Sequence, residues 1–163
     1  MVNGRALSIP LHFHRDYGIK YKKCRGDSGS NQIGVNDAMN VHESGEMYLE
    51  AILVLQRRND FVRSVDVGEY LGYSKPSVSR AMGLLRKGGL ITMERDGGLH
   101  LTEEGRSLAE KIYERHTVLS QVLMGLGVPE KIAVEDACKI EHDISDVTFE
   151  IIKKHIAAYE GSK

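Results

Sequence analysis

The 163-residue sequence has no tryptophan and only two cysteines, Cys24 and Cys138. Two cysteines are too few for the disulfide framework of a small secreted protein, so we expect a reducing compartment. No apolar run approaches the roughly 18 to 20 residues that a bilayer span requires, and the N-terminus lacks the apolar core of a signal peptide. These absences predict a cytoplasmic protein without membrane contact.

The sequence also lacks an excess of either charge. It has 22 Lys and Arg against 23 Asp and Glu, a formal net charge of -1. Without a global positive field, any contact with nucleic acid must come from a local basic patch. With 41% hydrophobic and 28% charged residues, the composition is typical of one globular domain, or of two small domains that share a core.

Residues 1–40 show no persistent apolar period. Basic residues and histidines alternate there with glycine and serine, and residues 26–31 have the composition of a flexible linker. We predict a poorly ordered N-terminal extension, with a basic arm as the alternative. Order should begin near His42, with Ser44 capping a helix whose apolar positions recur every three or four residues.

A helix-turn-helix pattern follows at residues 64–88. A short helix with Val67 and Leu71 inward precedes Gly72, and a second helix begins at a Ser74 cap with proline in its first turn. The second helix carries hydroxyl groups, which suit phosphates, and an arginine, which suits guanine. The alternative is a plain helical hairpin. The predicted DNA-binding residues of this helix are Ser74, Lys75, Pro76, Ser77, Ser79 and Arg80.

Two short strands, at residues 90–94 and 99–102, are predicted next. The turn signal Asp96-Gly97-Gly98 between them favours a β-hairpin, which after a helix-turn-helix is a wing. Arg95 at its tip is placed for phosphate or minor-groove contact. Thr102 then caps a long helix that contains His116 and ends at Gly125 and Gly127.

The helix predicted at residues 130–142 combines a thiol, carboxylates and an imidazole. Cys138, Glu141 and His142 are spaced i, i+3, i+4, so they project from one helix face. These donor types bind divalent transition metals, although one face supplies at most half a coordination sphere. The alternative is a solvated face with an ordinary buried cysteine. A last helix, capped by Ser145, has a wide apolar surface that a partner subunit could cover.

Five segments in this order resemble the diphtheria toxin repressor and manganese transport regulator family (DtxR/MntR). They are Glu46 to Glu50, Ser74 to Ser79, Gly97 to Gly105, Arg115-His116, and Glu135 to His142. The resemblance implies a mostly α fold, with a winged helix-turn-helix DNA-binding domain at residues 41–111 and an all-α metal-binding and dimerisation domain at 112–163. It also implies the short form of the family, without an SH3-like third domain.

The resemblance further implies a set of metal ligands. Met47, Cys138, Glu141 and His142 match the site of the iron-responsive branch, Glu50 matches a carboxylate ligand of the manganese branch, and His116 matches a ligand in both. Taken alone, Met47 would be core filler, Glu50 a surface carboxylate and His116 a structural histidine. Ser120 and Val134 stand where the iron branch has the Glu and His of its second site.

The function expected from these residues is that of a metal-dependent repressor controlling metal-ion homeostasis. It would bind palindromic double-stranded operator DNA as a homodimer when Fe²⁺ or Mn²⁺ is bound, with Co²⁺, Ni²⁺, Zn²⁺ and Cd²⁺ as plausible ligands in vitro. No organic cofactor is expected. The main alternative is a winged-helix regulator that responds to a non-metal ligand or to oxidation of Cys138. An enzyme is disfavoured, because no nucleophile–base pair and no His-Glu-x-x-His motif occur.

Overall fold

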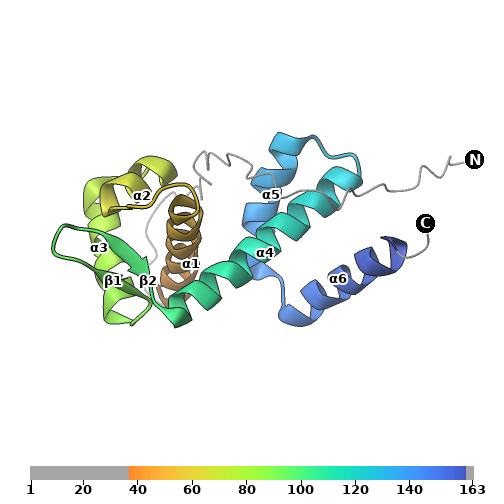
Figure 1. The fold of residues 1–163 in the computed structure, drawn as a ribbon. Coiled ribbons are helices and arrows are strands. Elements are labelled where there is room, and N and C mark those ends of the chain that lie inside the picture. The colour runs from red at the N-terminus through yellow and green to blue at the C-terminus, as the bar shows by residue number, and fades with distance from the viewer. Residues whose placement is uncertain (1–36, 161–163) are drawn as a thin grey trace, which may run out of the picture. The chain divides into compact units, whose positions relative to one another are not determined.

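The computed structural model describes the backbone of residues 37–160, and side chains for residues 45–158. In these residues it has six helices and one β-hairpin, in the order α1, α2, α3, β1, β2, α4, α5, α6 (Figure 1). The mostly α fold with a winged helix-turn-helix is therefore confirmed. The extension predicted at residues 1–40 lies outside the described residues, except that 37–40 belong to α1.

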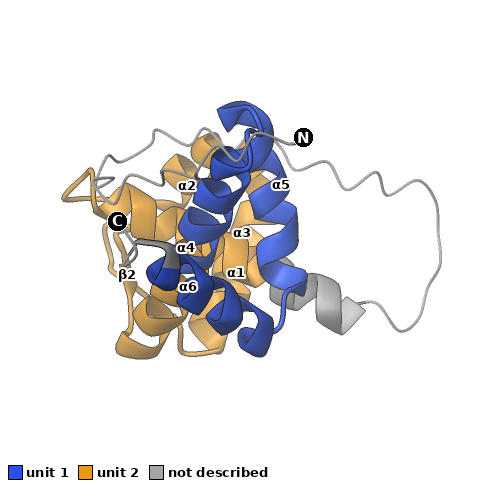
Figure 2. Ribbon diagram, turned by 90° about the vertical axis from the view of Figure 1, so that its right-hand side faces the viewer, with its two compact units in different colours: residues 1–19, 114–163 blue, residues 20–113 orange. Residues whose placement is uncertain are grey.

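The chain divides into two compact units (Figure 2). The described part of unit 2 is residues 37–113, and that of unit 1 is residues 114–160. The boundary falls inside α4, Glu103–Gly125, so one helix contributes to both units. None of the described helices is long and apolar enough to cross a membrane.

Helix α1, Asp37–Gln56, supplies much of the core of unit 2. Leu49, Ile52 and Leu53 are almost fully buried, and the three-to-four-residue spacing of such positions is what makes this segment an amphipathic helix. The prediction that Ser44 caps the helix was wrong, because α1 begins at Asp37, more than a turn earlier. Serine can cap a helix but also occurs inside one, so it did not fix where α1 begins.

Helices α2, Ser64–Leu71, and α3, Lys75–Lys87, form the helix-turn-helix. Gly72 has φ 70, a left-handed conformation that most side chains resist, and it turns the chain between the two helices. Val67 and Leu71 of α2 face inward as predicted, and Val78, Met82 and Leu85 form the buried face of α3. This packing leaves the opposite face of α3 exposed to solvent.

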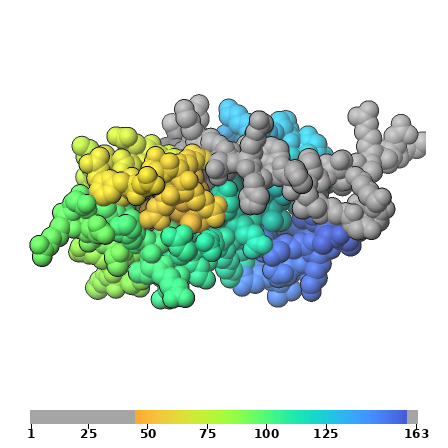
Figure 3. Space-filling model, in the orientation of Figure 1, coloured from red at the N-terminus to blue at the C-terminus, as the bar shows by residue number. Residues whose placement is uncertain are grey.

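The wing consists of β1, Ile91–Met93, and β2, Leu99–Leu101, paired antiparallel with Thr92 opposite His100. Gly97, with φ 89, lies in the turn. The hairpin tip stands out from the rest of unit 2 in the space-filling view (Figure 3). At the base, Thr102 Oγ1 accepts the N–H of Gly105, 3.1 Å away, so the predicted cap of α4 is present.

Unit 1 contains the C-terminal part of α4, with α5, Glu130–Asp143, and α6, Asp146–Glu160. The Arg115 guanidinium on α4 donates to the carbonyl oxygens of Glu141, at 3.0 Å, and Ile144, at 2.7 Å, and it pairs with Asp146 at the start of α6. Ser145 Oγ caps α6 by accepting the N–H of Thr148 at 3.2 Å, as predicted. One buried arginine thus joins all three helices of this unit.

Candidate metal centre and nucleic-acid interface

The predicted ligand face of α5 is directed into the interior. The Cys138 residue is 4% exposed and Glu141 is 2% exposed, and the His142 side chain is 4% exposed. On a solvated helix face, the side chains of Glu141 and His142 would be in water. Their burial therefore excludes the solvated-face alternative for these two residues. The structure brings a thiol, a carboxylate and an imidazole to one buried stripe of unit 1.

His116 joins this stripe from α4. Its Nδ1 lies 2.7 Å from Oε2 of Glu141, and both side chains are 1% exposed. The other oxygen, Oε1, lies 3.3 Å from Nε2 of His142. The Glu141 carboxylate therefore stands between two imidazole rings. If Nδ1–H of His116 donates to the carboxylate, its Nε2 carries the lone pair that a metal needs.

The chemistry of this donor set fits a divalent transition metal. Oε1 of Glu141 is buried and accepts no hydrogen bond from the described residues. A buried carboxylate without compensation costs several kcal/mol, which a cation can offset. Imidazole, carboxylate and thiolate are also the ligand types that such ions prefer. His116 and Glu141, which are in contact, could therefore ligate a metal, and a ligand role for Cys138 and His142 stays a prediction. Burial of Cys138 argues against its use as an oxidation sensor, because sensor thiols are accessible.

The other two predicted ligands lie one turn apart on α1, in unit 2. Glu50 is 1% exposed, so the surface-carboxylate alternative fails for this residue. Burial raises the pKa of Tyr70, the Arg58 charge lowers it, and the Glu50 charge adds a smaller increase, so Tyr70 lies near Glu50. Met47 is half-buried and its Sδ accepts a hydrogen bond from the hydroxyl of Tyr73 at 3.2 Å.

The predicted DNA-binding residues lie on the exposed side of α3 and at the wing tip. All seven are exposed, and their alternation with buried Val78 shows that one face of α3 packs while the other faces solvent. The hydroxyls of Ser74 and Ser77 are 2.9 Å apart at the helix N-terminus, where α3 has no acidic residue. The exposed residues are Ser74, Lys75, Pro76, Ser77, Ser79, Arg80 and Arg95.

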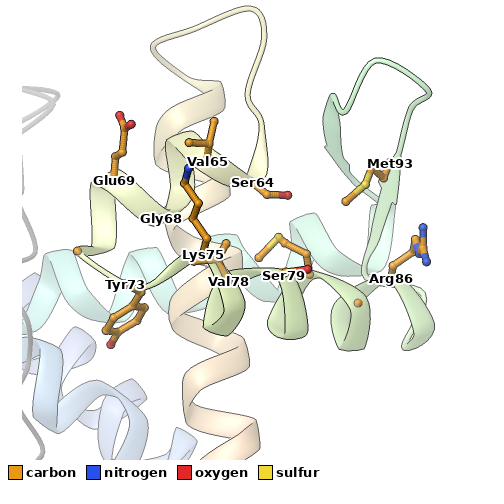
Figure 4. Close-up of a pocket in the computed structure, with 13 residues that line it drawn as sticks. Ser64, Val65, Gly68, Glu69, Tyr73, Lys75, Val78, Ser79, Arg86 and Met93 are labelled. Atoms are coloured by element: carbon orange, nitrogen blue, oxygen red, sulfur yellow. The ribbon is translucent and has the colours of Figure 1, made fainter.

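A groove of about 700 Å³ runs between α2, α3 and the wing. Ser64, Lys75 and Ser79 line it, and Arg86 and Met93 lie at its wing end (Figure 4). Of these, Ser64, Arg86 and Met93 were not among the predicted DNA-binding residues. The N-terminal position of Ser64 in a helix was a signal for a phosphate contact, whereas the place of Met93 depends on wing geometry that no local pattern encodes.

The two halves of the chain match two profiles. "Iron dependent repressor, N-terminal DNA binding domain" matches residues 40–99. "Iron dependent repressor, metal binding and dimerisation domain" matches residues 102–160. These two matches cover the winged helix-turn-helix and the helices that carry the buried donor cluster.

Individual proteins are similar over the same region. The transcriptional regulator MntR of Escherichia coli O6:H1 is 38% identical over 106 residues, which cover 65% of this chain and 68% of that protein. The diphtheria toxin repressor of Corynebacterium jeikeium is 29% identical over 121 residues, 74% of this chain and 50% of that protein. The structure of the manganese regulator SloR superposes with a TM-score of 0.63 at 28% identity, covering 69% of this chain and 53% of that one.

Proposed function

Because the chain belongs to the iron-dependent repressor family, we propose that it is a metal-dependent transcriptional repressor that controls metal-ion homeostasis. It binds palindromic double-stranded operator DNA as a homodimer when Fe²⁺ or Mn²⁺ is bound. The observation that carries this proposal is the buried cluster of Glu141 and two imidazoles in unit 1, in the segment that matches a metal-binding and dimerisation domain. DNA is the ligand of the exposed face of α3.

The metal ligands in this proposal are Met47, Glu50, His116, Cys138, Glu141 and His142. Support comes from donor chemistry and from burial within each unit: Glu50 in unit 2 and Glu141 in unit 1 are both buried carboxylates. A bound metal would supply the positive charge that such groups need. Thioether and thiolate favour Fe²⁺, Co²⁺, Ni²⁺, Zn²⁺ or Cd²⁺, whereas two carboxylates suit Mn²⁺, so the donor set admits both branches of the family.

The DNA contacts divide into positioning and reading residues. Ser74, Ser77 and Lys75 at the N-terminus of α3 suit phosphate oxygens, as does Arg95 on the wing. Arg80, exposed one turn further along α3, is placed to contact base edges in the major groove. Pro76 lies in the first turn of the helix, and Ser79 lines the groove beside it. In this division, Arg80 determines sequence specificity, and the phosphate contacts supply most of the affinity for DNA.

The regulatory step is a coupling of metal binding to DNA binding. Met47 and Glu50 belong to α1, which packs on the helix-turn-helix. The other four proposed ligands belong to the segment that matches a metal-binding and dimerisation domain. Two ligands that help each other do so by the same factor, on the order of 1 to 3 kcal/mol. We place this function in the cytoplasm, where operator DNA is accessible, and expect no catalytic activity from a binding protein of this family.

The test is operator binding by the full chain with and without metal. DNA upstream of the chain's own gene is the probe, in a gel shift with Mn²⁺, Fe²⁺, Co²⁺ or no metal. Retardation should require metal. His142→Ala should abolish the metal-stimulated part and leave the dimer intact, as judged by sedimentation. Retardation that is equal without metal would favour a regulator of another kind, and a full metal response by His142→Ala would refute the ligand assignment.

A further inference from the structure

Tyr73 connects a proposed metal ligand to the start of the recognition helix. Its hydroxyl donates to Met47 Sδ at 3.2 Å, across 26 positions of the chain. Its ring lies against Tyr48, with centroids 5.7 Å apart and planes inclined by 57°. Both contacts lie within unit 2. Tyr73 is among the residues that line the groove, and its ring points in the opposite direction to the Lys75 side chain (Figure 4).

The hydrogen bond leaves the sulfur able to bind a metal. A thioether sulfur has two lone pairs and is a weak acceptor, so one O–H···S bond occupies one of them. Methionine has three rotatable bonds and many positions for its sulfur. A donor that holds the sulfur in one orientation therefore reduces the entropy lost on ligation, which is the role that hydrogen-bonded partners play for metal ligands in general.

The backbone of Tyr73 is fixed just as closely to the recognition helix. Its N–H donates to the carbonyl oxygen of Gly68 at 3.0 Å, and Gly72 before it is left-handed. Ser74, the next residue, is the N-cap of α3. Tyr73 is therefore the chain neighbour of the hydroxyl pair at the helix N-terminus, Ser74 and Ser77.

We propose that Tyr73 is a positioning residue that couples the Met47 sulfur to the N-terminus of the recognition helix α3. It orients the sulfur for a metal, and the ligated sulfur in turn holds the turn before α3. This inference rests on the proposed function, because it takes Met47 as a ligand. It adds a residue that is neither a metal ligand nor a DNA contact in that proposal.

The experiment compares wild type, Tyr73→Phe, Met47→Leu and the double variant as full-length proteins. Tyr73→Phe removes the hydroxyl and keeps the ring that packs on Tyr48. Affinity for Cd²⁺ and for Fe²⁺, and the metal-stimulated gain in operator affinity, should each fall about 10-fold, the lower end of the range for groups that orient ligands. In the Met47→Leu background, Tyr73→Phe should change neither the metal affinity nor the metal-stimulated gain in operator affinity, because the sulfur that accepts the hydrogen bond is absent.

A spectroscopic readout separates this role from a merely structural one. With methionine methyls labelled with ¹³C, the Met47 signal, identified by its loss in Met47→Leu, should move in metal-free Tyr73→Phe toward the shift of a freely rotating methionine. Tyr48→Phe is the matched control, because it removes the neighbouring hydroxyl and retains the Tyr73–Met47 contact. Its Met47 signal and its metal response should equal those of wild type.

Three outcomes would overturn the inference. If wild type responds to metal and Tyr73→Phe responds equally, Tyr73 has no positioning role although the proposed function stands. If Tyr73→Phe loses affinity equally in the Met47→Leu background, the hydroxyl acts through another group. A wild-type protein whose operator affinity ignores every metal would refute the proposed function itself, and the inference with it.

Discussion

At the scale of single residues, the candidate metal ligands are buried or half-buried and the candidate DNA contacts are exposed. Glu141 lies between two imidazoles with almost no access to water, an arrangement that is costly unless a proton or a cation compensates the charge. Arg80 is exposed on α3. The buried group is therefore suited to ion binding, and the exposed group to a large polyanion.

Arg80→Ala should relax sequence preference at one base pair of the operator, by roughly 1 to 3 kcal/mol. The physical reason is that a guanidinium contacts guanine with two hydrogen bonds, which alanine cannot replace. Competition binding with a set of operators, each altered at one position, measures the effect, and Lys87→Ala at the exposed end of the same helix is the control. Equal losses on all sequences would instead make Arg80 a phosphate contact.

At the scale of elements, the chain before the wing approaches the first turn of α4 closely. A Cβ on Gly105 would lie 1.9 Å from the carbonyl oxygen of Leu90, which is backbone and cannot move aside cheaply. The same segment is held by Thr102, whose N–H donates to that oxygen and whose Oγ1 donates to the Gly89 carbonyl at 2.8 Å. The base of the wing is therefore set by contacts that admit no side chain.

Gly105→Ala should destabilise the protein by about 3 kcal/mol or more, because a clash with backbone forces α4 away from the wing. Chemical denaturation of the metal-free protein measures this. Gly83→Ala is the matched control: its Cβ meets nothing within 4 Å, so in a helix interior it should stabilise by about 0.5 to 1 kcal/mol. Similar stabilities of the two variants would contradict the close approach of α4 to Leu90.

Elements were more predictable than contacts between distant residues. The Thr102 and Ser145 caps, the Gly72 turn and the wing all depend on local rules, and each is present. The early start of α1 was not predictable from Ser44, because a residue that can cap a helix can also lie inside one. The Tyr73–Met47 bond joins residues 26 positions apart, and periodicity carries no information about such pairs.

The same limit applies to the donor cluster. The spacing of Cys138, Glu141 and His142 predicted a shared helix face, which the structure has. The spacing could not predict that His116 approaches Glu141, because that contact depends on how α4 packs on α5, with Arg115 holding the carbonyl end of α5. Only the resemblance to a known family pointed to His116, and its role as a ligand stays a prediction.

At the scale of the whole molecule, a palindromic operator requires two copies of the reading helix, so dimerisation is part of the function. Unit 1 lies in the segment that matches a dimerisation domain. It exposes large apolar side chains on α5 and α6: Ile140 is 39% exposed, Val147 71% and Ile151 61%. Val147 and Ile151 are four residues apart and share a helix face. Large exposed apolar side chains of this kind are what a partner subunit covers.

The double variant Ile140→Glu/Ile151→Glu should therefore be a monomer that retains metal binding and loses operator binding. Charges in a subunit interface cost several kcal/mol when desolvated, whereas the metal ligands of one chain are untouched. Sedimentation measures the mass, metal titration the site, and anisotropy of labelled operator DNA the binding. Lys154→Glu, an exposed charge reversal on the same helix, should remain dimeric. A dimeric double variant with wild-type operator affinity would place the interface on other residues of unit 1.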